Sequence, residues 1–546
     1  MPDRVDAIML YARTLATLRP SQTLGRLAYR LRKPRLTPAP TPAQRDRSAA
    51  WTAGCLTPAS MLGPDRFVFL NQVRDLGDQG GWNARGVEKL WLYNLHYFDD
   101  LNAVDADQRQ DWHVRLIERW VRENPVGAGN GWEPYTLSLR IVNWIKFALR
   151  QGTLSATATE SLANQVRYLT QRLEHHILGN HLLANAKALI FAGCYFAGEE
   201  ADHWLGVGLR ILAQQVDEQI LDDGAHFELS PMYHAIVLTD FLDIINMAGC
   251  YQVERRIPDL RVADMLSWLR AMSHPDGDVS FFNDSAFGIA APYDALRDYA
   301  VRLGVAPAHN PALTSTHLAA SGYLRLANQT AVLLIDAAAI GPRYLPAHAH
   351  ADTLSFELSL RDRRVLVNGG TSRYGTGPER HLERSTAAHN TLVIDGENSS
   401  EVWAGFRAGR RAKARIDRVD IGDTRSQTVA AQHDGYRRLP GRNLHHRVCT
   451  LQEDALLVDD KITGPFQSAE LFFHCHPDAQ VTLADNEATI TVGDDLEVKL
   501  IVDGGVLRCE QDNWHPGFGI ALPSTTLVAK AHGNTLKSRF TWTSRP

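Results

Sequence analysis

The stretch TLSFELSLRDRRVLV, residues 353–367, contains two short apolar runs joined by a charged turn. The apolar side chains of the first run are Leu354, Phe356, Leu358 and Leu360, which alternate with polar neighbours. The turn Arg361-Asp362-Arg363 then leads into Val365 and Val367. Successive side chains of a strand point to opposite faces of its sheet. This period of two therefore predicts a β-hairpin in an antiparallel sheet.

The rest of the C-terminal half repeats this pattern. Further runs with strand character are 331–336, 391–395, 446–450, 455–458, 471–474, 488–492 and 498–502. Many short strands with tight connections are typical of a sandwich or barrel. We therefore predict an antiparallel β-sandwich at residues 316–546, with its boundary near 310–321, where Pro, Ser and Thr cluster.

The chain before this boundary has a different period. From about residue 87 to 273, apolar side chains recur every three or four positions, as at Leu162, Val166, Leu169 and Leu173. This spacing is typical of helices with one apolar face. Further predicted helices are 135–149, 181–197, 201–221, 232–248 and 262–272. We therefore predict an all-α domain at residues 81–315.

Residues 1–80 carry weaker signals. The first forty residues could form a basic amphipathic helix, and 34–42 is predicted to be an extended Pro-rich linker. We expect this helix to dock on the helical domain. The alternative is an interfacial helix at a membrane surface.

The overall composition excludes few functions. The chain has 546 residues and a formal net charge of −5, which gives no global reason to expect a nucleic-acid or membrane partner. A local basic cleft could still hold a polyanion. The six cysteines have no C-x-x-C spacing, which argues against a disulfide scaffold or a cysteine-based zinc site. No secretory signal is recognised. We expect periplasmic or secreted action, with a cytoplasmic location as the alternative, and the oligomeric state stays open.

Four clusters of histidine and small polar residues lie where predicted elements begin. They are Gly179-Asn180-His181, the stretch 223–234 with Glu228 and Tyr233, His348-Ala349-His350, and Ala388-His389-Asn390-Thr391. Each has a simple structural alternative, such as a helix N-cap at Asn180 or a buried aromatic at Tyr233. Together they indicate a functional site, because the ends of elements are where scaffolds present reactive groups.

These clusters resemble the heparinase II/III family of polysaccharide lyases. Further matching stretches are 91–98, Trp132-Glu133-Pro134-Tyr135 with Arg140 and Trp144, Pro275-Asp276-Gly277 and Asn283-Asp284-Ser285. The resemblance covers about residues 87–477. It implies an incomplete (α/α) toroid followed by an antiparallel β-sandwich, with the active site in the cleft between them. It also implies an anionic polysaccharide as the partner.

The chemistry implied by the resemblance is β-elimination on a uronic acid. A base removes the C5 proton beside a carboxylate, and an acid protonates the departing C4 oxygen. The resemblance gives Asn180 and His348 the role of neutralising the carboxylate, and His181 and Tyr233 the roles of base and acid. Tyr233 could fill both roles in a syn elimination, with His181 the base in an anti elimination. Trp132, Arg140, Glu228 and Asn390 are candidates for binding the sugar.

The resemblance also implies a structural zinc ion in some family members. The corresponding positions are His350, His389 and Asn368, where the family pattern has Asp. A neutral amide is a poorer zinc ligand than a carboxylate, which puts the metal in doubt. The alternative is a hydrogen-bonded pair of His350 and His389. No cofactor is expected for the chemistry.

Three other functions compete with the lyase. A glycoside hydrolase would need two opposed carboxylates, for which Glu133, Asp223, Glu228 and Asp284 could be proposed. A non-catalytic carbohydrate-binding protein would be favoured by a blocked cleft. A zinc hydrolase using His348, His350 and His389 lacks an H-E-x-x-H helix.

Overall fold

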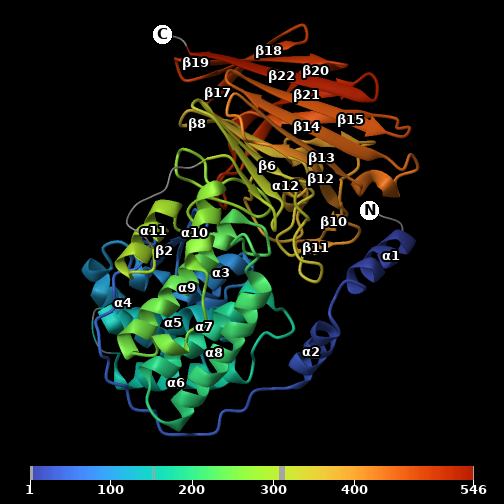
Figure 1. Cartoon of the computed structure of the whole chain (residues 1–546). Helices are drawn as coiled ribbons and strands as arrows, with labels where there is room; N and C mark the ends of the chain where they lie inside the picture. Colours follow the sequence, from blue (N-terminus) through green and yellow to red (C-terminus); the bar gives the residue numbers. More distant parts are fainter. Residues whose placement is uncertain (1–3, 151, 153, 307–313, 545–546) are drawn as a thin grey trace.

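The computed structural model describes residues 4–544 except 151, 153 and 307–313. Figure 1 shows a helical part and a strand part side by side, joined along one broad contact. The expected toroid and antiparallel β-sandwich are confirmed. Among the described residues, no helix has the length and hydropathy needed to cross a membrane.

The described residues of the helical part form nine principal helices. They are α3 (Lys89–Tyr97), α4 (Gln110–Glu123), α5 (Pro134–Arg150), α6 (Ala156–Thr170), α7 (Gly179–Tyr195), α8 (Glu199–Gln219), α9 (Pro231–Tyr251), α10 (Val262–Ala271) and α11 (Tyr293–Arg302). Helix α7 is central and packs against α5, α8 and α9. All of its residues are buried except His181. A helix that is apolar on every side belongs in a core, so the single partly open side chain of α7 draws attention to its N-terminus.

The strand part is built from three main antiparallel sheets and a small ribbon. The five-stranded sheet has the spatial order β4 (Thr316–Leu318), β5 (Tyr323–Ala327), β6 (Ala331–Asp336), β7 (Phe356–Leu360) and β8 (Arg363–Leu366), and the four-stranded sheet has the order β20 (Gly505–Trp514), β21 (Leu522–Ala531), β16 (Ala469–His474) and β9 (Leu392–Ile394). The eight-stranded sheet has the order β12 (Ala414–Asp420), β13 (Ser426–His433), β14 (Leu444–Gln452), β15 (Ala455–Thr463), β22 (Thr535–Ser544), β19 (Leu496–Asp503), β18 (Glu487–Val492) and β17 (Ala479–Ala484). The ribbon consists of β10 (Val402–Trp403) and β11 (Arg407–Ala408). The short helix α12 (Pro378–Glu383) also belongs to this part.

Strand β7, at the centre of the quoted stretch, is buried on both faces. Its apolar side chains enter the sandwich core, as predicted by their spacing. Its polar side chains face the toroid, where His274 contacts Glu357 at 2.8 Å and Ser359 at 2.7 Å. A buried polar group needs such a partner, so these contacts hold the two parts together at a fixed place.

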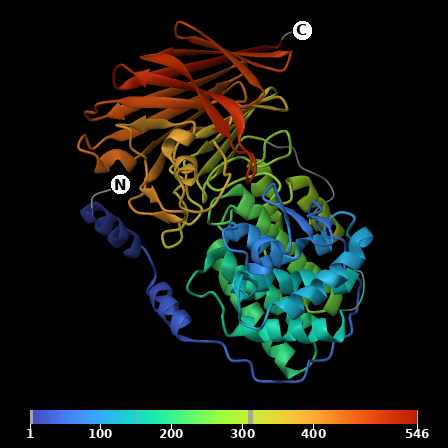
Figure 2. The same ribbon diagram turned by 180° about the vertical axis from the view of Figure 1, so that it is seen from behind.

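The N-terminal segment forms two helices and a small sheet. The helices are α1 (Arg4–Leu15) and α2 (Pro20–Leu31), and the antiparallel sheet consists of β1 (Met61–Gly63), β2 (Arg66–Phe69) and β3 (Gln72–Asp75). Figures 1 and 2 show α2 beside the toroid and α1 beside the strand part. The helical structure agrees with the sequence-based expectation for this segment, whereas the small sheet was not predicted.

Candidate active site

The first catalytic candidate, Asn180, lies at the N-terminus of α7. Gly179 before it has φ +59°, and an added Cβ there would lie 2.4 Å from Leu345 Cδ2 and 2.6 Å from Glu228 Oε1. Only glycine fits this close approach. The Asn180 backbone N–H donates to the Glu228 carboxylate. The helix N-terminus and the buried Glu228 therefore meet at the junction of the two parts.

His181 is the partly open residue of α7, with 33% of its side chain exposed. Its Nδ1 lies 3.1 Å from Glu174 Oε1, and its ring lies 4.4 Å from that of Tyr135. Burial lowers the pKa of His181, but the charge and hydrogen bond of Glu174 together with the charge of Glu228 outweigh burial and raise it above the ordinary value. Glu174 is itself fixed by the Asn185 side chain at 3.1 Å. His181 is thus an oriented imidazole with increased basicity.

Tyr233 lies in the first turn of α9. Ser230 caps this helix by accepting from the Tyr233 backbone N–H at 3.1 Å, and Pro231 occupies the first helical position. The Tyr233 ring stacks on His348 with centroids 3.7 Å apart. Its hydroxyl contacts the Tyr374 hydroxyl at 2.9 Å. Burial raises the pKa of Tyr233 well above its usual range, so the phenol is protonated at neutral pH.

Asp284 connects the remaining polar groups. Its carboxylate lies 2.9 Å from His348 Nδ1 and 2.8 Å from His350 Nε2, and Arg380 donates to both of its oxygens. Burial raises the pKa of Asp284, but Arg380 and the two histidines outweigh burial and lower it well below the usual range. An ionised carboxylate only accepts hydrogen bonds. His348 Nδ1 must therefore carry the proton of this contact.

Glu228 lies on the other side of His348. The distance from Glu228 Oε2 to His348 Nε2 is 3.6 Å, too long for a hydrogen bond, and this buried oxygen has no hydrogen-bond partner among the described residues. Burial raises the pKa of Glu228. Glu228 Oε2 and His348 Nε2 thus face each other without a hydrogen bond, and both atoms retain hydrogen-bonding capacity.

The structure places Asn180 and His348 beside Glu228 and stacks Tyr233 on His348, with His181 adjacent to Asn180 on α7. It also adds residues that the sequence analysis did not assign to the site: Glu174, Asp284, Tyr374 and Arg380. Asp284 stood in a matching motif without a role. Arg380 and Tyr374 lie in a segment with no distinctive spacing, and only its position just before the motif at 388–391 could have drawn attention to it.

Two expected sugar ligands are instead core residues, so this part of the prediction is wrong. Trp132 is 4% exposed and packs against Trp120 and Tyr168. Arg140 is fully buried over the Trp120 ring, and its guanidinium donates to Gln165, His96 O and Gly131 O. Their donors and rings are occupied within the toroid.

Asn390 is a third correction. Its amide nitrogen donates to Phe356 O at 2.8 Å and to Val367 O at 3.0 Å, while its oxygen accepts from His474 N–H at 2.6 Å. The side chain is fully buried. It joins β7 to neighbouring backbone segments, and its amide donors are used in these contacts rather than offered to a sugar.

The proposed metal ligands form a hydrogen-bonded pair. His350 Nδ1 lies 3.1 Å from His389 Nε2, and His389 Nδ1 lies 2.7 Å from Ser385 O. Burial lowers the pKa of His350 to about 4 and that of His389 to about 3. Two neutral rings have only two protons for the three contacts of this chain, because Asp284 and Ser385 O both accept. In the neutral pair the contact between His350 Nδ1 and His389 Nε2 therefore has no proton.

This histidine pair lacks the further ligands that zinc needs among the described residues. The third expected ligand, Asn368, is a neutral amide whose oxygen already accepts from Asn390 N–H at 3.1 Å. No group of three or more His, Cys, Asp or Glu side chains that could hold a metal occurs in the described part of the chain. Structural zinc sites normally have four ligands. The residues present do not fit such a site.

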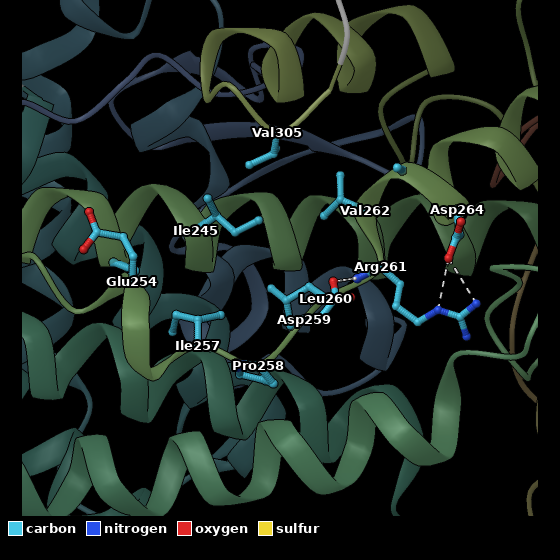
Figure 3. A pocket seen from close by; sticks show the side chains of 12 residues that line it. Ile245, Glu254, Ile257, Pro258, Asp259, Leu260, Arg261, Val262, Asp264 and Val305 are labelled. Atoms are coloured by element: carbon cyan, nitrogen blue, oxygen red, sulfur yellow. Dashed lines mark hydrogen bonds and ion pairs between the residues drawn. The ribbon is translucent and has the colours of Figure 1, made fainter.

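A separate pocket of about 490 Å³ lies beside α9 and the start of α10 (Figure 3). Apolar side chains of Ile245, Ile257 and Val262 line it, and Arg261 on its rim is paired with Asp264 at 3.1 Å. It shares no lining residue with the cluster around Glu228. Its lining also carries Glu254 and Asp259, but none of the histidine, tyrosine and asparagine side chains that characterise the cluster around Glu228.

Comparison with known families assigns both parts of the chain. Residues 102–301 match the model described as heparinase II/III N-terminus, and residues 310–543 match the model described as heparinase II/III-like, C-terminal. A crystal structure of a heparan sulfate lyase mutant from Pedobacter heparinus has a TM-score of 0.62 at 20% identity, covering 88% of this chain and 81% of that one. At this identity the likeness shows a shared fold.

Two curated relatives carry different names. A heparin-sulfate lyase of Pedobacter heparinus is 25% identical over 362 residues, which are 58% of this chain and 53% of the relative. The chain thus matches about half of that relative's length. The FtsZ-localized protein C of Caulobacter vibrioides is 25% identical over 447 residues, 76% of this chain and 74% of the relative.

We predict that the purified protein carries well below one zinc per chain and that chelation leaves its melting temperature unchanged, because no third zinc ligand joins His350 and His389 among the described residues. Elemental analysis and thermal unfolding with and without chelator measure this. Asn368→Asp is the matched variant and should bind more zinc. One zinc per wild-type chain, with a lower melting temperature after its removal, would contradict the assignment.

Proposed function

The chain belongs to the heparinase II/III family, and from this premise we propose that it is a polysaccharide lyase. It would cleave a uronic-acid-containing polysaccharide by β-elimination and leave a 4,5-unsaturated uronate at the new end. The observation that carries the proposal is the arrangement of His348 at the junction of the two parts: Tyr233 stacks on its ring, and Glu228, which accepts from the Asn180 backbone N–H, lies beside it.

The unused capacity at this junction suits a substrate carboxylate. Removing the proton beside a carboxylate builds further negative charge on it, and hydrogen-bond donors placed there stabilise that charge. In this proposal the Asn180 amide and His348 Nε2 donate to the carboxylate. Asp284 holds the opposite nitrogen of His348 at 2.9 Å and keeps the ring oriented. Glu228, whose pKa is raised by burial, can add a donor when protonated.

Proton transfer is assigned to His181 and Tyr233. The Tyr233 phenol is protonated at neutral pH and is suited to protonate the departing C4 oxygen. His181, whose basicity Glu174 increases, is suited to remove the C5 proton. This division corresponds to an anti elimination. In the syn alternative Tyr233 performs both transfers: its oxygen, ionised beforehand, takes the C5 proton and passes it to the C4 oxygen, and the Tyr374 hydroxyl at 2.9 Å would donate a hydrogen bond to that oxygen while it lacks its proton.

The substrate class proposed is an anionic glycosaminoglycan or a bacterial uronate exopolysaccharide. The heparin-sulfate lyase relative supports a glycosaminoglycan. No cofactor takes part, because the donors and the proton carriers are side chains of the chain itself.

A non-catalytic binding protein is the second candidate. One relative, the FtsZ-localized protein C, bears a name that states no enzymatic activity, and its match covers 76% of this chain. The complete set of Asn180, His181, Tyr233 and His348 favours the lyase. Detection of an unsaturated product separates the two candidates.

We predict that incubation with one of a panel of purified uronate polysaccharides produces ultraviolet absorbance from 4,5-unsaturated ends. Tyr233→Phe should reduce this turnover by about 10²–10⁴-fold, the usual contribution of one general acid–base group. The substitution keeps the stacked ring, so the melting temperature should change little.

Tyr195→Phe is the matched control, because its buried hydroxyl has no hydrogen-bond partner among the described residues and belongs to the far end of α7. It should leave turnover unchanged. Products without the double bond would show hydrolysis and overturn the lyase. If none of the polymers in the panel yields a product, the result would favour the binding protein.

We predict that Glu174→Gln shifts the acidic limb of the pH profile of kcat/KM to lower pH. A catalytic base must be neutral, so activity falls as the pH drops below the pKa of His181. Glu174 raises that pKa, and removing its charge lowers it. Glu160→Gln, on the exposed surface of α6, is the control and should shift nothing. An unshifted profile in Glu174→Gln would assign the base to Tyr233.

A further inference from the structure

The N-terminal arm, defined as α1, α2 and the basic run to Arg35, lies along the outside of the molecule. Figures 1 and 2 both show it as a separate strip that extends from the toroid to the strand part. Its two helices have 12 residues each. It contributes none of the residues that surround Glu228.

The inner face of the arm is fixed to both parts. On α2, the Tyr29 ring lies 4.2 Å from His176, and Arg172 donates to Tyr29 O at 2.6 Å. On α1, Arg13 pairs with Glu401 at 2.7 Å, and Trp403 donates to Thr14 Oγ1 at 3.1 Å. These contacts determine which side of each helix faces solvent.

The outer face of the arm is apolar and exposed. On α1 it carries Ile8, Met9 and Leu15, and on α2 it carries Leu24, Leu27 and Leu31, with exposed fractions between 47% and 73%. Leu24, Leu27 and Leu31 have the spacing of one helical stripe. Contiguous apolar surface of this kind marks an interaction site, whereas single exposed leucines do not.

The arm is also strongly basic. Residues 4–35 contain eight Arg and Lys and one acidic residue, Asp6, although the whole chain has a net charge of −5. Arg26 and Arg30 are exposed on α2, and Arg30, three positions after Leu27, lies beside the leucine stripe. An apolar stripe flanked by basic residues complements a surface with an apolar interior and an anionic edge.

We propose that the outer face of the N-terminal arm docks on an anionic lipid surface. A helix of 12 residues is ~18 Å long, shorter than the ~30 Å hydrocarbon core, so each helix would lie in the plane of the surface. The leucines enter the acyl region, and Arg26 and Arg30 contact the headgroups. The proposal concerns a surface outside the catalytic cluster and holds whether or not the chain is a lyase.

Docking would place the catalytic junction close to that surface. The inner face of α2 touches His176, four residues before Asn180. The inner face of α1 touches Trp403, three residues before Phe406, whose ring lies 6.1 Å from His348. The arm thus contacts loops that lead into the site from both parts of the molecule.

The test is co-sedimentation of the full chain with vesicles of phosphatidylglycerol and phosphatidylcholine, compared with phosphatidylcholine alone. We expect binding to the anionic vesicles that weakens as salt is added. Leu24→Asp and Leu31→Asp should each weaken it by about tenfold or more, because each removes an apolar insertion. Arg26→Glu and Arg30→Glu should each weaken it by at least about fivefold.

Val126→Asp is the matched control, since Val126 has an exposed fraction of 55% outside the arm and should leave binding unchanged. Circular dichroism and thermal unfolding check that every variant is folded. Equal binding to both vesicle types, no binding to either, or binding insensitive to the arm variants would overturn the proposal. A wild-type dimer that Leu24→Asp converts to a monomer, without vesicle binding, would assign the face to a second copy of this chain.

Discussion

The arrangement of the site depends on the buried Asp284 carboxylate. Asp284 comes from the toroid, whereas Arg380, His348 and His350, which surround it, come from the strand part. A buried charge is tolerated only when it is paired and hydrogen-bonded, and removing one partner of such a pair typically costs about 3–5 kcal/mol. The same contacts therefore join the two parts and orient His348 toward Glu228. A change in the packing of the two parts would therefore also change the position of His348 in the site.

The division of the fold could be predicted from the sequence because it rests on local periodicity. The alternation at Leu354–Leu360 indicates a strand whatever lies around it. The same alternation does not show that Glu357 and Ser359 are buried. Their partner, His274, is more than 80 residues away, so only the assembled structure reveals that the polar face of β7 is the contact with the toroid. The sheet at 61–75 was missed because its strands have at most four residues.

The candidate site was predictable where its residues stand in distinctive motifs, as Asn180, His181, Tyr233 and His348 do. Trp132 and Arg140 were misassigned because an aromatic ring or a guanidinium can either bind a sugar or stack on aromatic rings inside a core. Arg140 lies over the Trp120 ring, which shows that it is a core residue. Tyr374 and Arg380 were missed because their importance comes from contacts with Tyr233 and Asp284, which sequence spacing does not encode.

The central claim is that ionised Asp284 receives a proton from His348 Nδ1 and so leaves Nε2 directed to the substrate site. Nitrogen-15 NMR of protein labelled in its histidines tests this directly, with the His348 signals assigned by their loss in His348→Gln. The account predicts a protonated Nδ1 in the free protein at neutral pH. A His348 ring protonated only on Nε2 would contradict it, because Asp284 could then not be the group that orients the ring.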